Sequence, residues 1–129
     1  MEPPTVLIAD DDVDLRLYLR TCLESLGPRI ARVIEAADGL TALRLARSGV
    51  VDVLISDVVM PGLNGRALCD AIRADAGLRA IPVLLISGED PAAGAGSADA
   101  FLAKPFNAHQ LLAAVEGLLS AHGRPPPDA

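Results

Sequence analysis

The sequence has no tryptophan and only three aromatic residues, Tyr18, Phe101 and Phe106. Flat aromatic faces on which bases or sugars stack are therefore scarce, which counts against a platform for single-stranded nucleic acid or carbohydrate. Basic residues are outnumbered by acidic ones, 11 to 17, and the formal net charge is −6. Because a groove that follows a phosphate backbone needs an excess of positive charge, we expect no direct contact with nucleic acid.

Long apolar runs and cysteine motifs are also missing. No run approaches the ~20 residues of a transmembrane helix, and the first four residues lack the basic stretch of a secretion signal, so we expect no membrane insertion. Cys22 and Cys69 show neither CxxC nor zinc-ligand spacing, and both fall among helical apolar positions. We therefore expect two buried, reduced thiols in a cytoplasmic protein.

Enough hydrophobic sequence is present for one well-packed domain. The chain has 129 residues, of which 51% are hydrophobic and 22% charged. This length and composition predict one globular domain over residues 1–123 and exclude a disordered chain. Residues 124–129, RPPPDA, cannot continue a helix, and we interpret them as an extended tail or the stub of a linker.

Short, continuous apolar runs alternate with segments of helical periodicity. The runs that we interpret as strands cover residues 5–9, 32–36, 53–56, 82–87 and 100–103. Because these runs are apolar throughout rather than alternating, both faces of the sheet should be covered. The sequence therefore predicts an α/β fold with a doubly wound parallel sheet.

Four helices are predicted from apolar stripes and capping signals. The first stripe contains Leu15, Tyr18, Leu19, Cys22, Leu23 and Leu26, and Gly27-Pro28 ends it. Asp38 is expected to cap a second helix that stops at Gly49, and a third helix carries Leu68, Cys69 and Ile72 on one face. Asn107 and Gln110 have the spacing of a capping box before the last helix, with Phe106 and Leu111 placed as a hydrophobic staple.

One segment breaks the alternation of strand and helix. Residues 88–99 fall where a helix would normally follow the fourth strand, but they contain three glycines and no residue of leucine size. Glycine inside a helix costs about 1 kcal/mol relative to alanine. We expect at most one or two irregular turns there, although an ordinary alanine-rich short helix remains an alternative.

Charged and hydroxyl side chains follow four of the five predicted strands. Asp10, Asp11 and Asp12 follow the first, Asp57 the third, Ser87 ends the fourth, and Lys104 follows the fifth. Ligands of open parallel sheets bind at the carboxyl ends of the strands. If these four strands are neighbours, at least three carboxylates meet one hydroxyl and one ammonium group.

Such a group of carboxylates needs a counter-charge, and Mg²⁺ suits a site with oxygen ligands that also binds phosphate. One carboxylate could then act as a nucleophile toward a phosphoryl group. The metal, Lys104 and the Ser87 hydroxyl could bind the phosphoryl oxygens.

These residues, in this order, resemble the receiver domain of bacterial two-component response regulators, the CheY-like superfamily. The resemblance runs from Val6 to Leu119 and is carried by Asp10-Asp11, by the segment DVVMPGLNG at residues 57–65, by Ser87 and by Lys104-Pro105-Phe106. It implies a flavodoxin-like sheet of five strands in the order 2-1-3-4-5. The gap from Ser87 to Lys104 is more than one helical turn shorter than the family's, so the fourth helix would be shortened or irregular.

The resemblance also implies a role for each site residue. Asp57 would be the phospho-acceptor, and Asp11 the principal Mg²⁺ carboxylate, supported by Asp10 and by the backbone carbonyl of Val59. Ser87 and Phe101 would be the switch residues, and Lys104 would pair with the acceptor and then with the phosphate. The bond between Lys104 and Pro105 would be a cis peptide. Asp12 we interpret as the cap of the first helix rather than as a metal ligand.

The function implied is signal transduction rather than metabolism. A histidine kinase or a histidine phosphotransfer protein would donate a phosphoryl group to Asp57, and the modified domain would bind a different protein target. Apart from accepting this group and slowly losing it, the chain would not be an enzyme. A phosphorylation-independent binding scaffold with the same fold is the alternative, and a homodimer stays open. A phosphohydrolase is disfavoured because Val59 stands where that chemistry wants a second aspartate.

Overall fold

The computed structural model describes residues 3–27, 32–88 and 96–121. These residues form five strands, β1 (Thr5–Ala9), β2 (Arg32–Ala36), β3 (Val53–Asp57), β4 (Val83–Ser87) and β5 (Ala100–Ala103). They also form the helices α1 (Val13–Glu24), α2 (Gly39–Arg47), α3 (Gly65–Ala74) and α4 (Ala108–Ala121). The predicted boundary at residue 123 and the tail 124–129 lie outside the described residues.

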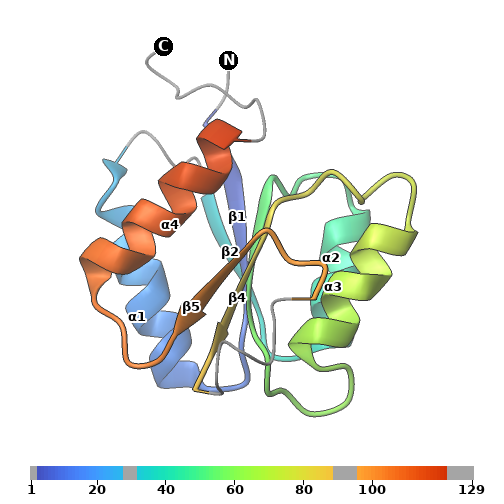
Figure 1. Cartoon of the computed structure of the whole chain (residues 1–129), viewed down its shortest axis with the longest axis horizontal. Coiled ribbons are helices and arrows are strands. Elements are labelled where there is room, and N and C mark those ends of the chain that lie inside the picture. Colours follow the sequence, from blue (N-terminus) through green and yellow to red (C-terminus); the bar gives the residue numbers. More distant parts are fainter. Residues whose placement is uncertain (1–2, 28–31, 89–95, 122–129) are drawn as a thin grey trace.

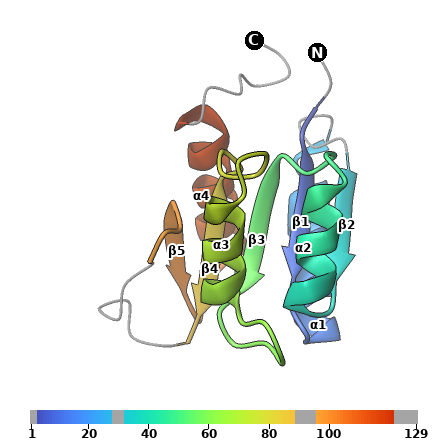
Figure 2. The ribbon, with the colours of Figure 1, turned by 90° about the vertical axis from the view of Figure 1, so that its right-hand side faces the viewer.

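All five strands run parallel, in the order β2-β1-β3-β4-β5. The predicted doubly wound sheet and its strand order are thus confirmed. Figure 1 shows α1 and α4 on one side of the sheet and α2 and α3 on the other. Figure 2, turned by 90°, shows that the strands end at one common edge of the sheet.

The three central strands β1, β3 and β4 are buried throughout, because helices cover both faces of the sheet and successive side chains point to opposite faces. The outer strands β2 and β5 are only partly buried. Val6, Ile8, Ile55 and Ile86 pack with α1 and α4, whereas residues such as Leu7, Leu54 and Leu85 pack with α2 and α3. Both cysteines are free and buried, as predicted, Cys22 in the first of these layers and Cys69 in the second. None of the helices described has the length and apolar character needed to cross a bilayer.

The predicted helix caps are present. The Asp12 carboxylate accepts hydrogen bonds from the N–H groups of Asp14 and Leu15, and the Asp38 carboxylate accepts one from Thr41. Asn107 and Gln110 exchange two hydrogen bonds of 2.9 and 2.8 Å, which is the predicted capping box. These three helices, α1, α2 and α4, therefore begin where the sequence predicted.

The prediction for the first helix was wrong in two details. The helix ends at Glu24 rather than at Leu26, and Gly27 adopts a positive φ of 64° after it. Tyr18, expected in the buried stripe, is 41% exposed. Its ring instead lies 6.1 Å from that of Phe106, at the edge of the contact between α1 and α4, so only Leu19, Cys22 and Leu23 of the stripe are fully buried.

The connection between β4 and β5 is short. At most one or two irregular turns were expected over residues 88–99. Residues 89–95 of this segment lie outside the described residues, and residues 96–99 contain a turn and no helix. Arg73 on α3 binds this end of the connection, because its guanidinium donates to the carbonyl of Ser97 and pairs with the Asp99 carboxylate. The same carboxylate accepts a hydrogen bond of 2.8 Å from the Val83 N–H, which ties the start of β5 to the start of β4.

Candidate functional site

The carboxyl ends of β1, β3, β4 and β5 bring the predicted site residues to one edge of the sheet. Asp10 follows β1, Asp57 and Ser87 are the last residues of β3 and β4, and Lys104 comes directly after β5. A cleft of about 480 Å³ opens between them. Its lining residues are Asp11, Asp12, Asp57, Val59, Ser87, Gly88 and Lys104.

Asp57 lies at the base of this cleft and is only 7% exposed. Its Oδ2 is 2.8 Å from the Nζ of Lys104, and its Oδ1 accepts a hydrogen bond of 3.1 Å from the backbone N–H of Val59. Both carboxylate oxygens are therefore held, one by an ammonium group and one by a backbone amide.

Lys104 keeps its charge in this setting. Burial alone would lower the pKa of its ammonium group, but the hydrogen bond and charge of Asp57, together with the charges of Asp10 and Asp12, outweigh burial and raise it. The Lys104 N–H also donates to the backbone carbonyl of Ser87 at 2.9 Å, which joins the ends of β4 and β5. The peptide bond between Lys104 and Pro105 is cis, as the resemblance implied.

Asp10 is the most deeply buried acid of the site, with 1% of its surface exposed. Burial raises the pKa of its carboxyl from 3.8 to about 6. The hydrogen bond from the Asp12 N–H and the charge of Lys104 act against this rise, whereas the charges of Asp57 and Asp11 add to it. Asp10 lies behind the cleft rather than on its surface, while Asp11 is exposed and lines it.

The two predicted switch residues lie on the neighbouring strands β4 and β5, two register positions apart. Ser87 is fully buried and lines the cleft, and Phe101 on β5 is half-buried against the layer of α2 and α3. Phe101 pairs in register with Leu85, two residues before Ser87 on β4.

A divalent cation fits the chemistry of the cleft. Four carboxylates (Asp10, Asp11, Asp12 and Asp57) lie in or behind it against the ammonium of Lys104, so the cleft is acidic. Within residues 3–27, 32–88 and 96–121, no three acidic, histidine or cysteine side chains form a metal site by themselves. A cation here would have to combine carboxylates with backbone oxygen and water, which is the coordination that Mg²⁺ tolerates best.

Two glycines, Gly39 and Gly65, shape the loop that follows Asp57. The sequence pattern assigned neither of them a packing role. A Cβ atom on Gly65 would lie 2.2 Å from the backbone oxygen of Asp57, and one on Gly39 would lie 2.1 Å from that of Leu63. Both distances are far shorter than any real contact, so only glycine allows α3 and α2 to start against this loop. Gly65 closes the segment DVVMPGLNG and was part of the predicted motif, but the sequence did not show that it lies against the backbone of Asp57.

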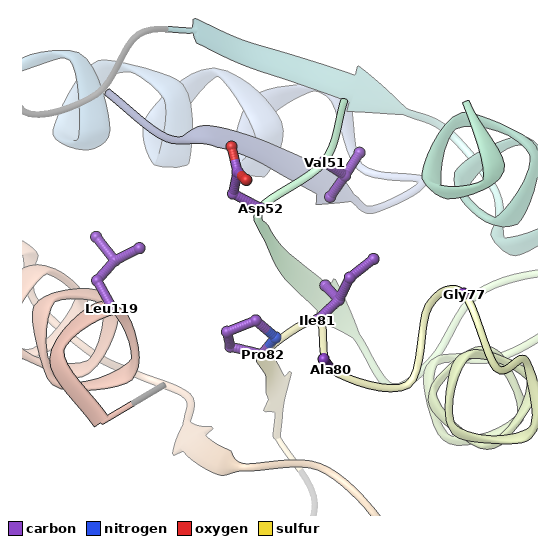
Figure 3. A pocket seen from close by; sticks show the side chains of 7 residues that line it. All are labelled: Val51, Asp52, Gly77, Ala80, Ile81, Pro82 and Leu119. Carbon is purple, nitrogen blue, oxygen red and sulfur yellow. The ribbon is translucent and has the colours of Figure 1, made fainter. Parts of the chain in front are cut away.

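A second cavity, of about 220 Å³, lies at the opposite edge of the sheet (Figure 3). Its lining includes Val51, Asp52, Ile81, Pro82 and Leu119, and it contains none of the predicted site residues. The Asp52 carboxylate accepts a hydrogen bond of 2.8 Å from the Thr5 N–H, so this acid holds the start of β1. The predicted site residues thus lie at the carboxyl ends of the strands and not at this second cavity.

A sheet in this order, with an acidic cleft at its carboxyl edge, defines a CheY-like α/β domain. The family model of the response regulator receiver domain matches residues 6–116. The chain therefore belongs to the response regulator receiver domain family, whose members act in two-component signalling.

Relatives of two kinds share this domain. The chemotaxis protein CheY of Pseudomonas aeruginosa is 38% identical over 117 residues, which are 86% of this chain and 92% of that protein. The sensor histidine kinase TmoS of Ectopseudomonas mendocina is 34% identical over 124 residues, 92% of this chain but 12% of the kinase. The chain thus spans nearly all of one relative and a small part of the other.

Solved structures agree with this assignment. The signal receiver domain of a signal transduction histidine kinase from Syntrophus aciditrophicus matches with a TM-score of 0.83 and 32% identity, over 96% of both chains. The receiver domain of a sensor histidine kinase from Pseudomonas aeruginosa PAO1 matches with a TM-score of 0.81 and 26% identity, over 92% of this chain and 98% of that one. The latter structure has a magnesium ion coordinated in its active site cleft.

Proposed function

We propose that this domain accepts a phosphoryl group on Asp57 from a phosphohistidine donor in a Mg²⁺-dependent reaction. The observation that carries the proposal is the contact between the Lys104 ammonium and the Asp57 carboxylate at the base of an acidic cleft. A buried carboxylate that faces an open cleft, with a cation beside it, is a suitable nucleophile for phosphoryl transfer.

In the proposed step, a carboxylate oxygen of Asp57 attacks phosphorus in line with the leaving imidazole. The new bond is an acyl phosphate O–P bond, the P–N bond to the donor histidine breaks, and the imidazole takes up a proton. Lys104 would compensate charge on the phosphoryl oxygens, and the Ser87 hydroxyl, which lines the same cleft, would donate a hydrogen bond to one of them.

Bound Mg²⁺ would neutralise charge on the phosphoryl oxygens and on the carboxylates. Asp11, Asp57 and the Val59 carbonyl would hold it, with Asp10 in support, because these groups combine carboxylate and carbonyl oxygens at one end of the cleft. The magnesium ion in the matched Pseudomonas receiver supports this choice of cation.

The phosphorylated and free states would differ at Ser87 and Phe101 and would bind different proteins. This would be a population shift between two conformations, driven by the added charge of the phosphoryl group. The donor would be a histidine kinase or a histidine phosphotransfer protein, since the relatives include a sensor kinase and a CheY. With such a donor and a protein target, the domain would act in the cytoplasm.

The test is the intact mass of the chain after incubation with Mg²⁺ and acetyl phosphate, or with a phosphoramidate that imitates phosphohistidine. The wild type should gain one phosphoryl group, and Asp57→Asn or removal of Mg²⁺ with EDTA should abolish the gain. Asp75→Asn is the matched control and should behave like the wild type, because Asp75 lies at the C-terminal end of α3, where it pairs with Arg47 at the end of α2. A wild type that binds no Mg²⁺ and gains no mass would favour the phosphorylation-independent scaffold.

A further inference from the structure

Arg16, which lies outside the cleft, holds the backbone of the acid-bearing loop. Its Nη1 donates a hydrogen bond of 2.6 Å to the backbone carbonyl of Asp10. That carbonyl belongs to the peptide that joins Asp10 to Asp11, and peptide units are planar. A hydrogen bond that restrains this oxygen therefore restrains the plane, and with it the positions of the N and Cα atoms of Asp11 from which its side chain starts.

Arg16 is itself held by Glu35 on β2. The Nε of Arg16 is 3.0 Å from one carboxylate oxygen of Glu35, and the Nε of Arg20 is 2.6 Å from the other. Burial would raise the pKa of Glu35, but the hydrogen bonds and charges of the two arginines outweigh burial and lower it. Because a guanidinium is rigid and planar, Arg16 cannot turn away from the Asp10 carbonyl without disturbing its bond to Glu35.

The remaining contacts of Asp10 leave Arg16 as the side chain that fixes this peptide. The Asp10 N–H donates to the carbonyl of Ala36 at 3.1 Å, and the Asp10 carboxylate accepts from the Asp12 N–H at 2.8 Å. The first hydrogen bond holds the backbone at Asp10, and the second holds the backbone at Asp12. The carbonyl between them is held from α1, by a side chain that is 16% exposed and does not line the cleft.

We propose that Arg16, fixed by Glu35, is a positioning residue that keeps Asp11 in its place in the lining of the cleft, which it shares with Asp57. The inference rests on the proposed function, because its consequence is a higher affinity of the cleft for Mg²⁺. Arg16 touches neither the cation nor the phosphoryl group in this account. It acts only through the Asp10–Asp11 peptide.

Arg20 provides a matched control. Arg16→Met and Arg20→Met each remove one ion pair with Glu35 and one hydrogen bond to a backbone carbonyl, but the carbonyl that Arg20 reaches is that of Val33, at 2.9 Å. If Arg16 matters only as part of the ion-pair network, the two variants should behave alike. If it positions the acid loop, they should differ.

Two readouts on the whole chain decide between these outcomes. The first is the Mg²⁺ dissociation constant from an NMR titration, and the second is the exchange rate of the Asp12 amide without metal. Groups that orient metal ligands typically contribute about 10–100-fold to affinity. We expect Arg16→Met to weaken Mg²⁺ binding about tenfold and to speed Asp12 exchange by a similar factor, and Arg20→Met to change each less than about twofold.

Unchanged binding and exchange in Arg16→Met, or equal changes in both variants, would overturn the proposal. Arg16→Gln covers the case in which Arg16→Met does not fold, because a glutamine amide ends near the position of Nε and can serve Glu35 but not the Asp10 carbonyl. It should show the same loss as Arg16→Met. A wild type without Mg²⁺ affinity would refute the proposed function, while the exchange rates would still decide the role of Arg16.

Discussion

Replacing Asp10 with asparagine should stabilise the metal-free protein at neutral pH. Asp10 is 1% exposed, and burial is the main reason that the pKa of its carboxyl rises from 3.8 to about 6. The folded protein therefore disfavours the charged form that neutral pH imposes. Asparagine keeps the oxygen that accepts the hydrogen bond from the Asp12 N–H and removes the charge.

The size and the sign of the effect follow from the two pKa values. Between pH 3.8 and about 6 the folded state binds more protons than the unfolded state, so stability falls as the pH rises through this range and then levels off. A difference of about two pH units, at about 1.4 kcal/mol each, puts the cost of the charged carboxyl at up to about 3 kcal/mol above pH 6. Asp10→Asn removes this cost.

Chemical denaturation followed by circular dichroism, in EDTA at pH 3.5 and at pH 7.5, measures this cost. We expect the free energy of unfolding of Asp10→Asn to exceed that of the wild type by about 1–3 kcal/mol at pH 7.5. At pH 3.5 the two free energies should be almost equal. Asp11→Asn, which removes the same formal charge from an exposed neighbour, should give a smaller gain. A destabilised Asp10→Asn at pH 7.5, or a gain that does not change with pH, would refute the reasoning.

Three further predictions concern the acceptor loop and the β4–β5 connection. Val59→Asn should speed the loss of the phosphoryl group about fivefold. The valine side chain, which is 64% exposed, cannot hold an attacking water, whereas asparagine can, and one neutral hydrogen bond is worth about 1 kcal/mol. The decay of the phosphorylated mass with time measures this rate. Gly65→Ala should cost about 1–3 kcal/mol of unfolding free energy, because its Cβ would meet the Asp57 carbonyl; unchanged stability would contradict this. Arg73→Gln should lower the free energy of unfolding by about 2 kcal/mol, since Arg73 also donates to the Ile81 carbonyl at 2.7 Å. In the same denaturation experiment, Arg79→Gln should change it by almost nothing, because Arg79 is exposed.

The sequence predicted the elements that depend on local pattern. The continuous apolar run that ends at Ser87 indicates a strand covered on both faces, and β4 is buried throughout. Asn107 and Gln110 indicate a helix start at the right residue because a capping box involves only neighbours along the chain. Tyr18 was misplaced because the period of a helix gives the direction of its apolar face but not the width of the face that its neighbours cover.

The sequence predicted which residues form the candidate site, but not which residues hold them in place. Local pattern places Asp10, Asp57 and Lys104 at strand ends, but only the strand order makes those ends neighbours, and that order came from the family resemblance. The contact of Gly39 with Leu63 and the contact of Arg16 with Glu35 join residues 24 and 19 positions apart. No periodicity encodes such pairs, so they emerge only once the sheet is assembled.

The central claim is that Asp57 carries the phosphoryl group, and locating the modified residue tests it most directly. The chain is incubated with Mg²⁺ and acetyl phosphate, reduced with borohydride so that an aspartyl phosphate becomes homoserine, and then digested and sequenced by mass spectrometry. We expect homoserine at position 57 alone. Homoserine at position 10, 11 or 12 instead, with Asp57 unmodified, would contradict it.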